Sequence, residues 1–212
     1  MTAREWSYAK TAGSMRLNSV VHWLAKWQIV LICGVLTIAF TLFLSATDRA
    51  APAGTPGIIQ LELAFSEDRF SDIVEQWSQA STLQIQQRNL WIDLLFPFAY
   101  VLLLSGLVAW LTRSSHEKPS AGLIALLSLP FIAGLLDWIE NVFLLFRLRD
   151  VSSFAEPLVF LASAVSLAKW ILILVTVLAI IYCILRRVLD WSGRSCHLPV
   201  RPGSRHRARH VI

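Results

Sequence analysis

Charged side chains are scarce in this 212-residue sequence: they make up 16% of it, whereas 56% of the residues are hydrophobic. A soluble domain usually contains about a quarter charged residues, so the composition excludes water as the main solvent for most of the chain. The net charge is +5, but no basic stretch is interleaved with aromatic residues on a polar scaffold. We therefore expect no nucleic-acid partner, and we attribute the basic charge to segments that face anionic membrane lipid.

Cysteine is also rare, and the three residues Cys33, Cys183 and Cys196 fall in apolar runs or in the basic tail. No structural disulfide is expected from that placement. The five histidines lie in or beside segments that we assign to the cytoplasmic side, which excludes a histidine metal site or a histidine base inside the membrane. The common motifs of serine hydrolases, zinc proteases, phosphate-binding loops and CxxC redox proteins are missing. The sequence thus predicts no metal and no cofactor, and it identifies no catalytic residue.

Long apolar runs, in contrast, are abundant, and four of them are long enough to cross a bilayer. A transmembrane helix needs about 20 predominantly apolar residues at a rise of about 1.5 Å per residue. The runs cover residues 27–46, 90–112, 121–146 and 157–185. The first is a retained span, because both the run and the segment before it are longer than in a signal peptide. The predicted fold is an all-α integral membrane protein, with a four-transmembrane-helix bundle over residues 27–186.

The loop of residues 47–89, between the first and second spans, is the only sizeable polar segment inside this domain. Ser66 is a suitable helix N-cap, and acidic residues follow it in the first turn. Phe70, Ile73, Val74 and Trp77 recur at i, i+3, i+4 and i+7, which predicts a short amphipathic helix. Its polar face is acidic, so we expect this helix to pack over the mouth of the bundle rather than bind anionic lipid.

The lysines and arginines predict the orientation of the chain, because they concentrate in cytoplasmic loops. On the side of the termini lie Arg4, Lys10, Arg16, Lys26, Arg113, Lys118, Arg186, Arg187, Arg194, Arg201, Arg205, Arg207 and Arg209. The opposite side has only Arg49, Arg69, Arg88, Arg147 and Arg149. We therefore expect a plasma (inner) membrane protein with a cytoplasmic flank (residues 1–26) and a basic cytoplasmic tail (residues 187–212). Met15 offers an alternative start, which leaves open whether residues 1–14 belong to the native product.

A few polar residues lie within the spans, where a charge costs about 2.5–3.5 kcal/mol on insertion scales. Counting residues from the span ends places one set near the middle of the bilayer and a second set nearer the outside. Helical spacing puts the members from each helix on one face. The predicted ligand-binding or ion-pair cluster consists of Tyr100, Asp137 and Lys169 in the deeper tier, and Asp93, Glu140 and Asn141 in the shallower tier.

Three acids thus face one lysine in the predicted cluster. The simplest pairing joins Lys169 to Asp137, with Glu140 as the alternative partner, and either pairing leaves two carboxylates over. This excess of acid is the strongest functional signal in the sequence. The first span has no charge, and we expect it to contribute packing only.

Three functions fit these observations. The first is a protein that binds or moves a small cationic, proton-coupled or lipid ligand in an outward-facing cavity, with membrane lipid around it and a homodimer expected. The second is an accessory or structural protein, assembled with a partner membrane protein, whose buried charges fix the helices; base rates rank it at least level with the first. The third is an intramembrane enzyme on a lipid, with Asp93 and Glu140 as acid and base and Tyr100 as a donor. It ranks last because no nucleophile or metal constellation is visible.

Overall fold

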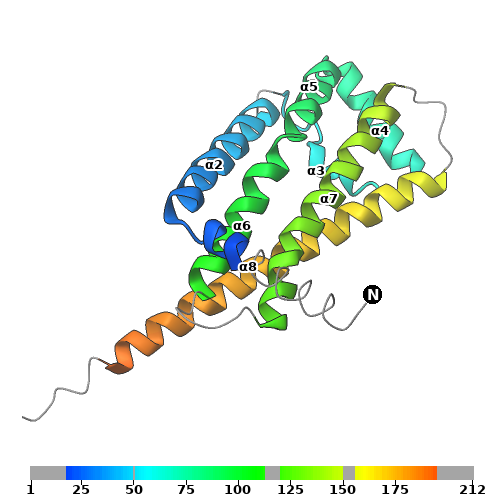
Figure 1. Ribbon diagram of the computed structural model, residues 1–212. Coiled ribbons are helices and arrows are strands. Elements are labelled where there is room, and N and C mark those ends of the chain that lie inside the picture. The colour runs from blue at the N-terminus through cyan, green and yellow to red at the C-terminus, as the bar shows by residue number, and fades with distance from the viewer. Residues whose placement is uncertain (1–17, 50, 113–119, 150–155, 195–212) are drawn as a thin grey trace, which may run out of the picture.

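A computed structural model of the chain describes residues 18–49, 51–112, 120–149 and 156–194, and these ranges form helices without any sheet. After a short helical stretch at residues 18–24, the helices are α2 (Trp27–Arg49), α3 (Ile58–Glu62), α4 (Glu67–Gln79), α5 (Leu83–Asp93), α6 (Phe96–Thr112), α7 (Ala121–Arg149) and α8 (Glu156–Arg194) (Figure 1). Residues 1–17, the connection with Arg113 and Lys118, and the tail from residue 195 lie outside the described residues. Much of the predicted charge asymmetry falls on those segments.

Within the described residues, three helices are long and apolar enough to cross a membrane by themselves: α2, α7 and the Pro157–Leu189 part of α8. Helices α5 and α6 form a fourth candidate, as a pair bent by 44°. Large apolar side chains such as Leu42, Phe146 and Leu178 are more than half exposed on these helices, an arrangement that suits a lipid solvent. The predicted all-α membrane fold is confirmed, and the chain is a multi-pass helical membrane protein.

The second predicted span differs from expectation, because it is broken between Asp93 and Phe96 rather than continuous over residues 90–112. Pro97 has no N–H to donate to the carbonyl of Asp93, and its ring clashes with that carbonyl in a regular helix. At the break, the carbonyl of Leu94 accepts a hydrogen bond from Trp138 Nε1 at 2.9 Å. The bend is therefore fixed by α7.

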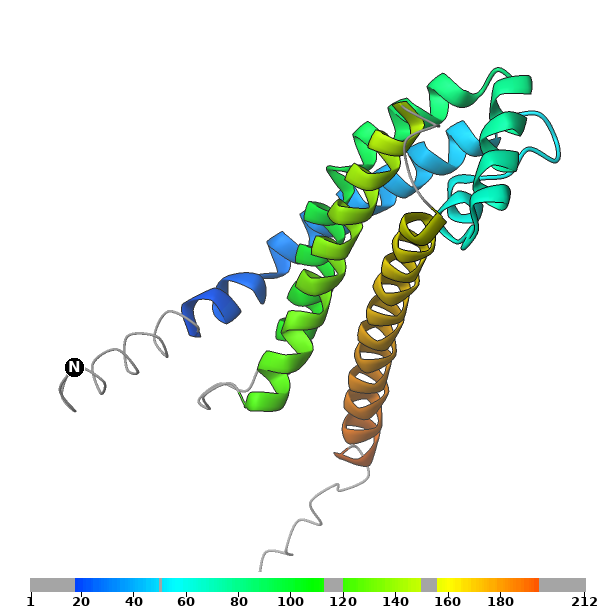
Figure 2. The ribbon, with the colours of Figure 1, turned by 90° about the vertical axis from the view of Figure 1, so that its right-hand side faces the viewer.

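The long helices pack around α6, which contacts α2, α7 and α8 (Figures 1 and 2). Helix α8 lies mainly along α7. Gly134 of α7 allows a close approach to α6, since a Cβ there would lie 2.6 Å from Cγ2 of Val101. Helices α2 and α8 thus sit on different sides of α6, and this separation shapes the cavity described below.

Figure 2 shows α3, α4 and α5 gathered at one end of the long helices, and we call this part of the chain, residues 58–93, the cap. The amphipathic helix predicted in the 47–89 loop is confirmed as α4, and the side chain of Ser66 accepts a hydrogen bond from the Arg69 N–H at its start. The predicted apolar face is buried, and it packs against α7 and α8 through a core that includes Phe70, Ile73, Val74, Trp77, Leu144, Leu148 and Val159. Helix α4 therefore covers one end of the bundle, as its acidic polar face indicated.

Two arginines at the end of α7 contact residues of the cap. Arg147 is 1% exposed and forms an ion pair with Glu67, and its guanidinium lies 5.3 Å from the ring centre of Phe70. The guanidinium of Arg149 lies 5.9 Å from the ring centre of Trp91. These interactions give both charges local partners at the end of the span.

Candidate functional site

A lysine surrounded by three carboxylates forms the polar centre of the described structure. The Lys169 ammonium lies 2.6 Å from Glu140 Oε2, 3.0 Å from Asp137 Oδ1 and 3.4 Å from Glu62 Oε2. All four side chains are at most 5% exposed. We call Glu62, Asp137, Glu140 and Lys169 the Lys169 cluster. Both partners considered at the sequence level, Asp137 and Glu140, contact the lysine at once.

Helix geometry explains how α7 supplies two of these acids. Asp137 and Glu140 are three residues apart, so they lie on the same face of the helix, about one turn from each other. Helix α8 runs along α7 and presents Lys169 to that face. A buried ion pair of this kind needs nearly complete compensation of its charges to offset desolvation.

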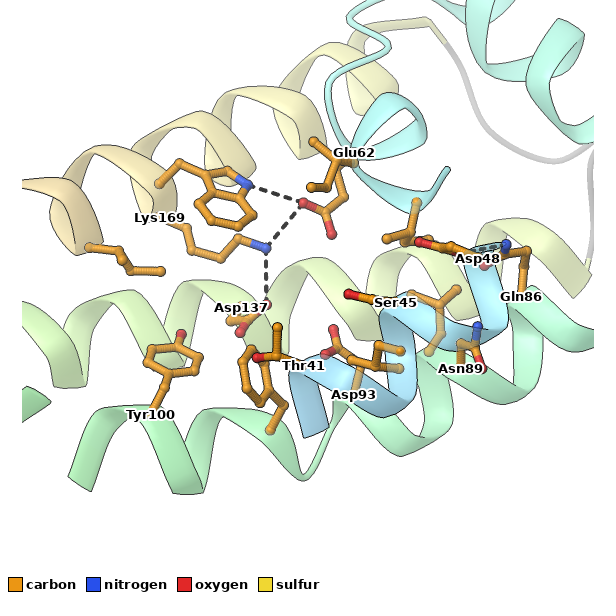
Figure 3. Close-up of a pocket in the computed structure, with 17 residues that line it drawn as sticks. Thr41, Ser45, Asp48, Glu62, Gln86, Asn89, Asp93, Tyr100, Asp137 and Lys169 are labelled. Atoms are coloured by element: carbon orange, nitrogen blue, oxygen red, sulfur yellow. Dashed lines mark hydrogen bonds and ion pairs between the residues drawn. The ribbon is translucent and has the colours of Figure 1, made fainter. Parts of the chain in front are cut away.

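Glu62 was missed at the sequence level, although it is one of the three acids on the lysine. It lies at the end of α3 and is 5% exposed, and it also accepts a hydrogen bond from Trp170 Nε1 at 3.2 Å. Figure 3 shows both contacts as dashed lines. The available signal was its setting, because Glu62 is a single acid among the apolar residues of IIQLELAF.

Contacts on both sides of α3 hold Glu62 in place. Before the helix, the carbonyl of Pro56 accepts a hydrogen bond from Trp77 Nε1 at 2.7 Å. After it, the Phe65 N–H donates to Ser163 Oγ of α8 at 3.0 Å. Phe65 has a φ of 56°, an uncommon conformation for a bulky residue, which persists only where surrounding contacts stabilise it.

Asp93 is bonded to Asn141 rather than to Lys169. Its Oδ2 accepts a hydrogen bond of 2.9 Å from the side-chain amide of Asn141, which is fully buried on α7. The Asn141 amide is neutral, so this bond satisfies one carboxylate oxygen without adding a positive charge. Of the shallower tier of the prediction, Asp93 and Asn141 are therefore joined to each other by a hydrogen bond, whereas Glu140 contacts Lys169.

A cavity of about 380 Å³ lies between α2, α3, α5, α6, α7 and α8. Four carboxylates line it, those of Asp48, Glu62, Asp93 and Asp137, together with one lysine, Lys169. Figure 3 shows Tyr100 and Lys169 toward one end and Asp48, Gln86 and Asn89 toward the other. The carboxylates outnumber the lysine, and the lysine is already bound by three acids.

The six predicted site residues divide between the wall of the cavity and the layer behind it. Asp93, Tyr100, Asp137 and Lys169 line the cavity. Glu140 and Asn141 lie behind the wall, where they contact Lys169 and Asp93.

The expectation that the first span contributes packing only is wrong. Thr41, Ser45 and Asp48 of α2 line the cavity, and they recur at i, i+4 and i+7 on one helical face. Asp48 lies at the end of the span, beyond the residue 46 boundary that was predicted. Counting charges only within the apolar run therefore left it out.

Gln86 and Asn89, two amide side chains in the wall of the cavity, donate hydrogen bonds to residues of α2. The side-chain amide N–H groups of Gln86 and Asn89 donate to Asp48 Oδ1 at 3.0 Å and to Thr47 Oγ1 at 2.7 Å. The Thr47 hydroxyl itself donates to the Leu44 carbonyl at 2.7 Å, so Thr47 must be the acceptor from Asn89. This fixes the orientation of the Asn89 amide, and the Asp48 carboxylate fixes that of Gln86.

Two amide oxygens, Gln86 Oε1 and Asn89 Oδ1, remain buried without a hydrogen-bond partner among the described residues. Both side chains belong to residues that are at most 5% exposed and line the cavity. An unsatisfied buried acceptor costs about 1–3 kcal/mol. These two oxygens and the hydroxyl of Tyr100, which is also buried without a partner among the described residues, are thus unsatisfied polar groups within the wall.

Comparisons with known proteins add no family assignment. No protein-family model, no curated protein and no solved structure matches the chain. The function is therefore argued from the cavity itself.

Proposed function

We propose that the protein binds an organic cation with an apolar body, of the alkylammonium class, in the cavity beside the Lys169 cluster. The observation that carries this proposal is the surplus of acid: four carboxylates line the cavity, Lys169 is already bound by three acids, and the donors to Asp48 and Asp93 among the described residues are neutral amides. A primary ammonium has three donors and no acceptor. It complements this wall in both charge and hydrogen bonding.

The rest of the cavity suits the apolar part of such a ligand. Leu44, Ile58, Leu90, Phe96 and Ile173 contribute to the wall, and burial of apolar surface contributes about 25 cal/mol per Å². A volume of about 380 Å³ falls within the range of small-molecule sites, roughly 300–1,000 Å³. The carboxylates in one part of the wall would bind the ammonium, and the apolar side chains in the rest would contact the hydrocarbon part of an amphiphilic amine.

The structural role considered at the sequence level has its own supporting observation. The Lys169 cluster joins α3, α7 and α8 through three buried ion pairs. We assign this cluster to helix assembly and assign the ammonium to Asp48 and Asp93, whose donors among the described residues are neutral amides. Of the acid and base weighed for an enzyme, Asp93 lines the cavity, whereas Glu140 lies behind its wall and is paired with Lys169, which favours binding over catalysis.

The proposed orientation keeps the termini in the cytoplasm and the cap outside, in a plasma or inner membrane. Its support is the excess of lysine and arginine in the N-terminal flank, in the connection with Arg113 and Lys118, and in the C-terminal tail. Four helices are few for a complete transporter, so movement of the ligand across the bilayer would require a second copy or a partner membrane protein.

Unbiased mass spectrometry of small molecules that copurify with the protein tests this proposal. We expect lipophilic amines to be enriched with the native chain and depleted with Asp93→Asn prepared in parallel. Amines that only partition into the detergent should be recovered equally from both proteins, so the comparison removes their contribution. Recovery of neutral or anionic lipids alone, in equal amounts from both proteins, would contradict the proposal.

A further inference from the structure

The walls of the cavity also point to the route that its ligand takes. Resting on the proposed function, we infer that the ligand is a long-chain amine dissolved in the bilayer, which reaches the cavity sideways between α2 and α8. Three observations support this route: the separation of these helices, the exposure of lining side chains, and the position of Asp48 near the end of its span.

Helices α2 and α8 are both walls of the cavity, but each is held mainly by other helices. Helix α2 packs on α6 and α5, whereas α8 packs on α7 and α6 (Figures 1 and 2). Thr41 of α2 is exposed and Trp170 of α8 is 40% exposed, and both line the cavity. Side chains that face both the cavity and the outer surface indicate that the cavity reaches the surface between these helices.

The surface beside this opening is one that lipid would cover. Leu42, next to Thr41, is 63% exposed, and Ile171 and Leu174, next to Trp170 and Ile173, are 52% and 57% exposed. All belong to helices that are apolar enough to span a membrane. An apolar opening at this depth admits a solute from hydrocarbon more readily than from water.

Asp48 lies near the end of α2 and therefore near an interface of the membrane, whereas Tyr100 and Lys169 lie toward the other end of the cavity (Figure 3). Asp48 of α2 and the cap residues Gln86 and Asn89 lie together at one end of the cavity (Figure 3). Thr41 is seven residues before Asp48 on α2, which is about 10 Å deeper along the helix. An amphiphile in a bilayer keeps its charged group at the interface and its chain toward the core, so its ammonium would lie on the Asp48 side of the cavity.

The same charges argue against a zwitterionic phospholipid as the ligand. Its phosphate would face the lining carboxylates, and the lining lysine Lys169 is already bound by three acids. Like charges in a poorly solvated site are strongly unfavourable. The ligand class is thus a single-chain amine without an anionic group.

A pair of tryptophan variants tests the route in nanodiscs of neutral lipid. Thr41→Trp narrows the opening, and Leu42→Trp adds the same bulk to the neighbouring lipid-facing position as the control. With dodecylamine, we expect Thr41→Trp to slow association about tenfold and Leu42→Trp to change it by less than about twofold. Butylamine, which is water-soluble and short, should bind to the native protein and to Leu42→Trp with affinities within about twofold, and Thr41→Trp should slow its association less than that of dodecylamine.

A dodecylamine with a photoreactive diazirine at its chain end gives an independent readout. Peptide mapping should locate its label on α2 and α8, around Thr41 and Ile173, and an excess of butylamine should remove it. Labelling confined to the cap, with an unchanged dodecylamine rate in Thr41→Trp, would show that the route is wrong while amine binding stands. If neither amine binds above empty nanodiscs, the proposed function itself fails.

Discussion

Replacement of Lys169 by methionine is expected to destabilise the assembled protein by about 3–5 kcal/mol, because it leaves buried charges without their counterion. Glu62, Asp137 and Glu140 are at most 5% exposed and converge on the Lys169 ammonium. Methionine retains much of the length and apolar packing of the lysine stem. Thermal unfolding in detergent, together with the monodisperse fraction in size-exclusion chromatography, measures the loss.

Arg187→Met is the matched control for this substitution. Arg187 is exposed and donates to the Trp110 carbonyl at 3.4 Å, so its loss should change stability by no more than about 0.5 kcal/mol. Adding Asp137→Asn and Glu140→Gln to Lys169→Met removes two of the orphaned charges and should restore part of the stability. A Lys169→Met protein as stable as the native one would show that the Lys169 cluster does not fix the helices.

Asp93→Asn is expected to weaken binding of dodecylamine by about ten- to a hundredfold while leaving the fold intact. A hydrogen bond to a charged group contributes about 1.5–3 kcal/mol, which corresponds to that range of affinity. The fold should survive because Asn141 Oδ1 is buried and unpaired within the described residues. It can accept a hydrogen bond from the new asparagine amide. Isothermal titration in nanodiscs measures the affinity, and thermal unfolding verifies the fold.

Glu140→Gln is a control that shows whether loss of any buried carboxylate weakens dodecylamine binding, or only loss of one that lines the cavity. It neutralises a carboxylate that contacts Lys169 but lies behind the cavity wall. We expect its dodecylamine affinity to stay within about threefold of the native value, while its stability falls. If Glu140→Gln weakened binding as much as Asp93→Asn, the assignment of the ammonium to the Asp93 side of the cavity would be untenable.

Local patterns in the sequence were sufficient for much of the fold. Run length and hydropathy predicted the membrane helices, and apolar periodicity predicted α4 with Ser66 at its start. Counting residues from the span ends brought Asp137 and Lys169 to one level, and their ammonium–carboxylate distance is 3.0 Å. These features depend on helix geometry alone, which is the same wherever a helix packs.

The remaining features depend on contacts between distant parts of the chain. Glu62 is 107 residues from Lys169, so no local spacing relates the two, and its partner is set by how α3 folds back over α8. Asp48 became part of the cavity because α2 continues to Arg49, beyond its apolar run. The break before Pro97 depends on both the proline and the indole of Trp138 on another helix.

The central claim is that the cavity recognises an ammonium group, and a comparison of dodecylamine with dodecanol tests it most directly. The two molecules share a chain and differ only in the polar group, so titration of each into native protein in nanodiscs, corrected for empty nanodiscs, isolates the contribution of the charge. We predict that dodecylamine binds at least about tenfold more tightly, which corresponds to about 1.4 kcal/mol or more. Equal binding of the amine and the alcohol, or tighter binding of the alcohol, would contradict the account.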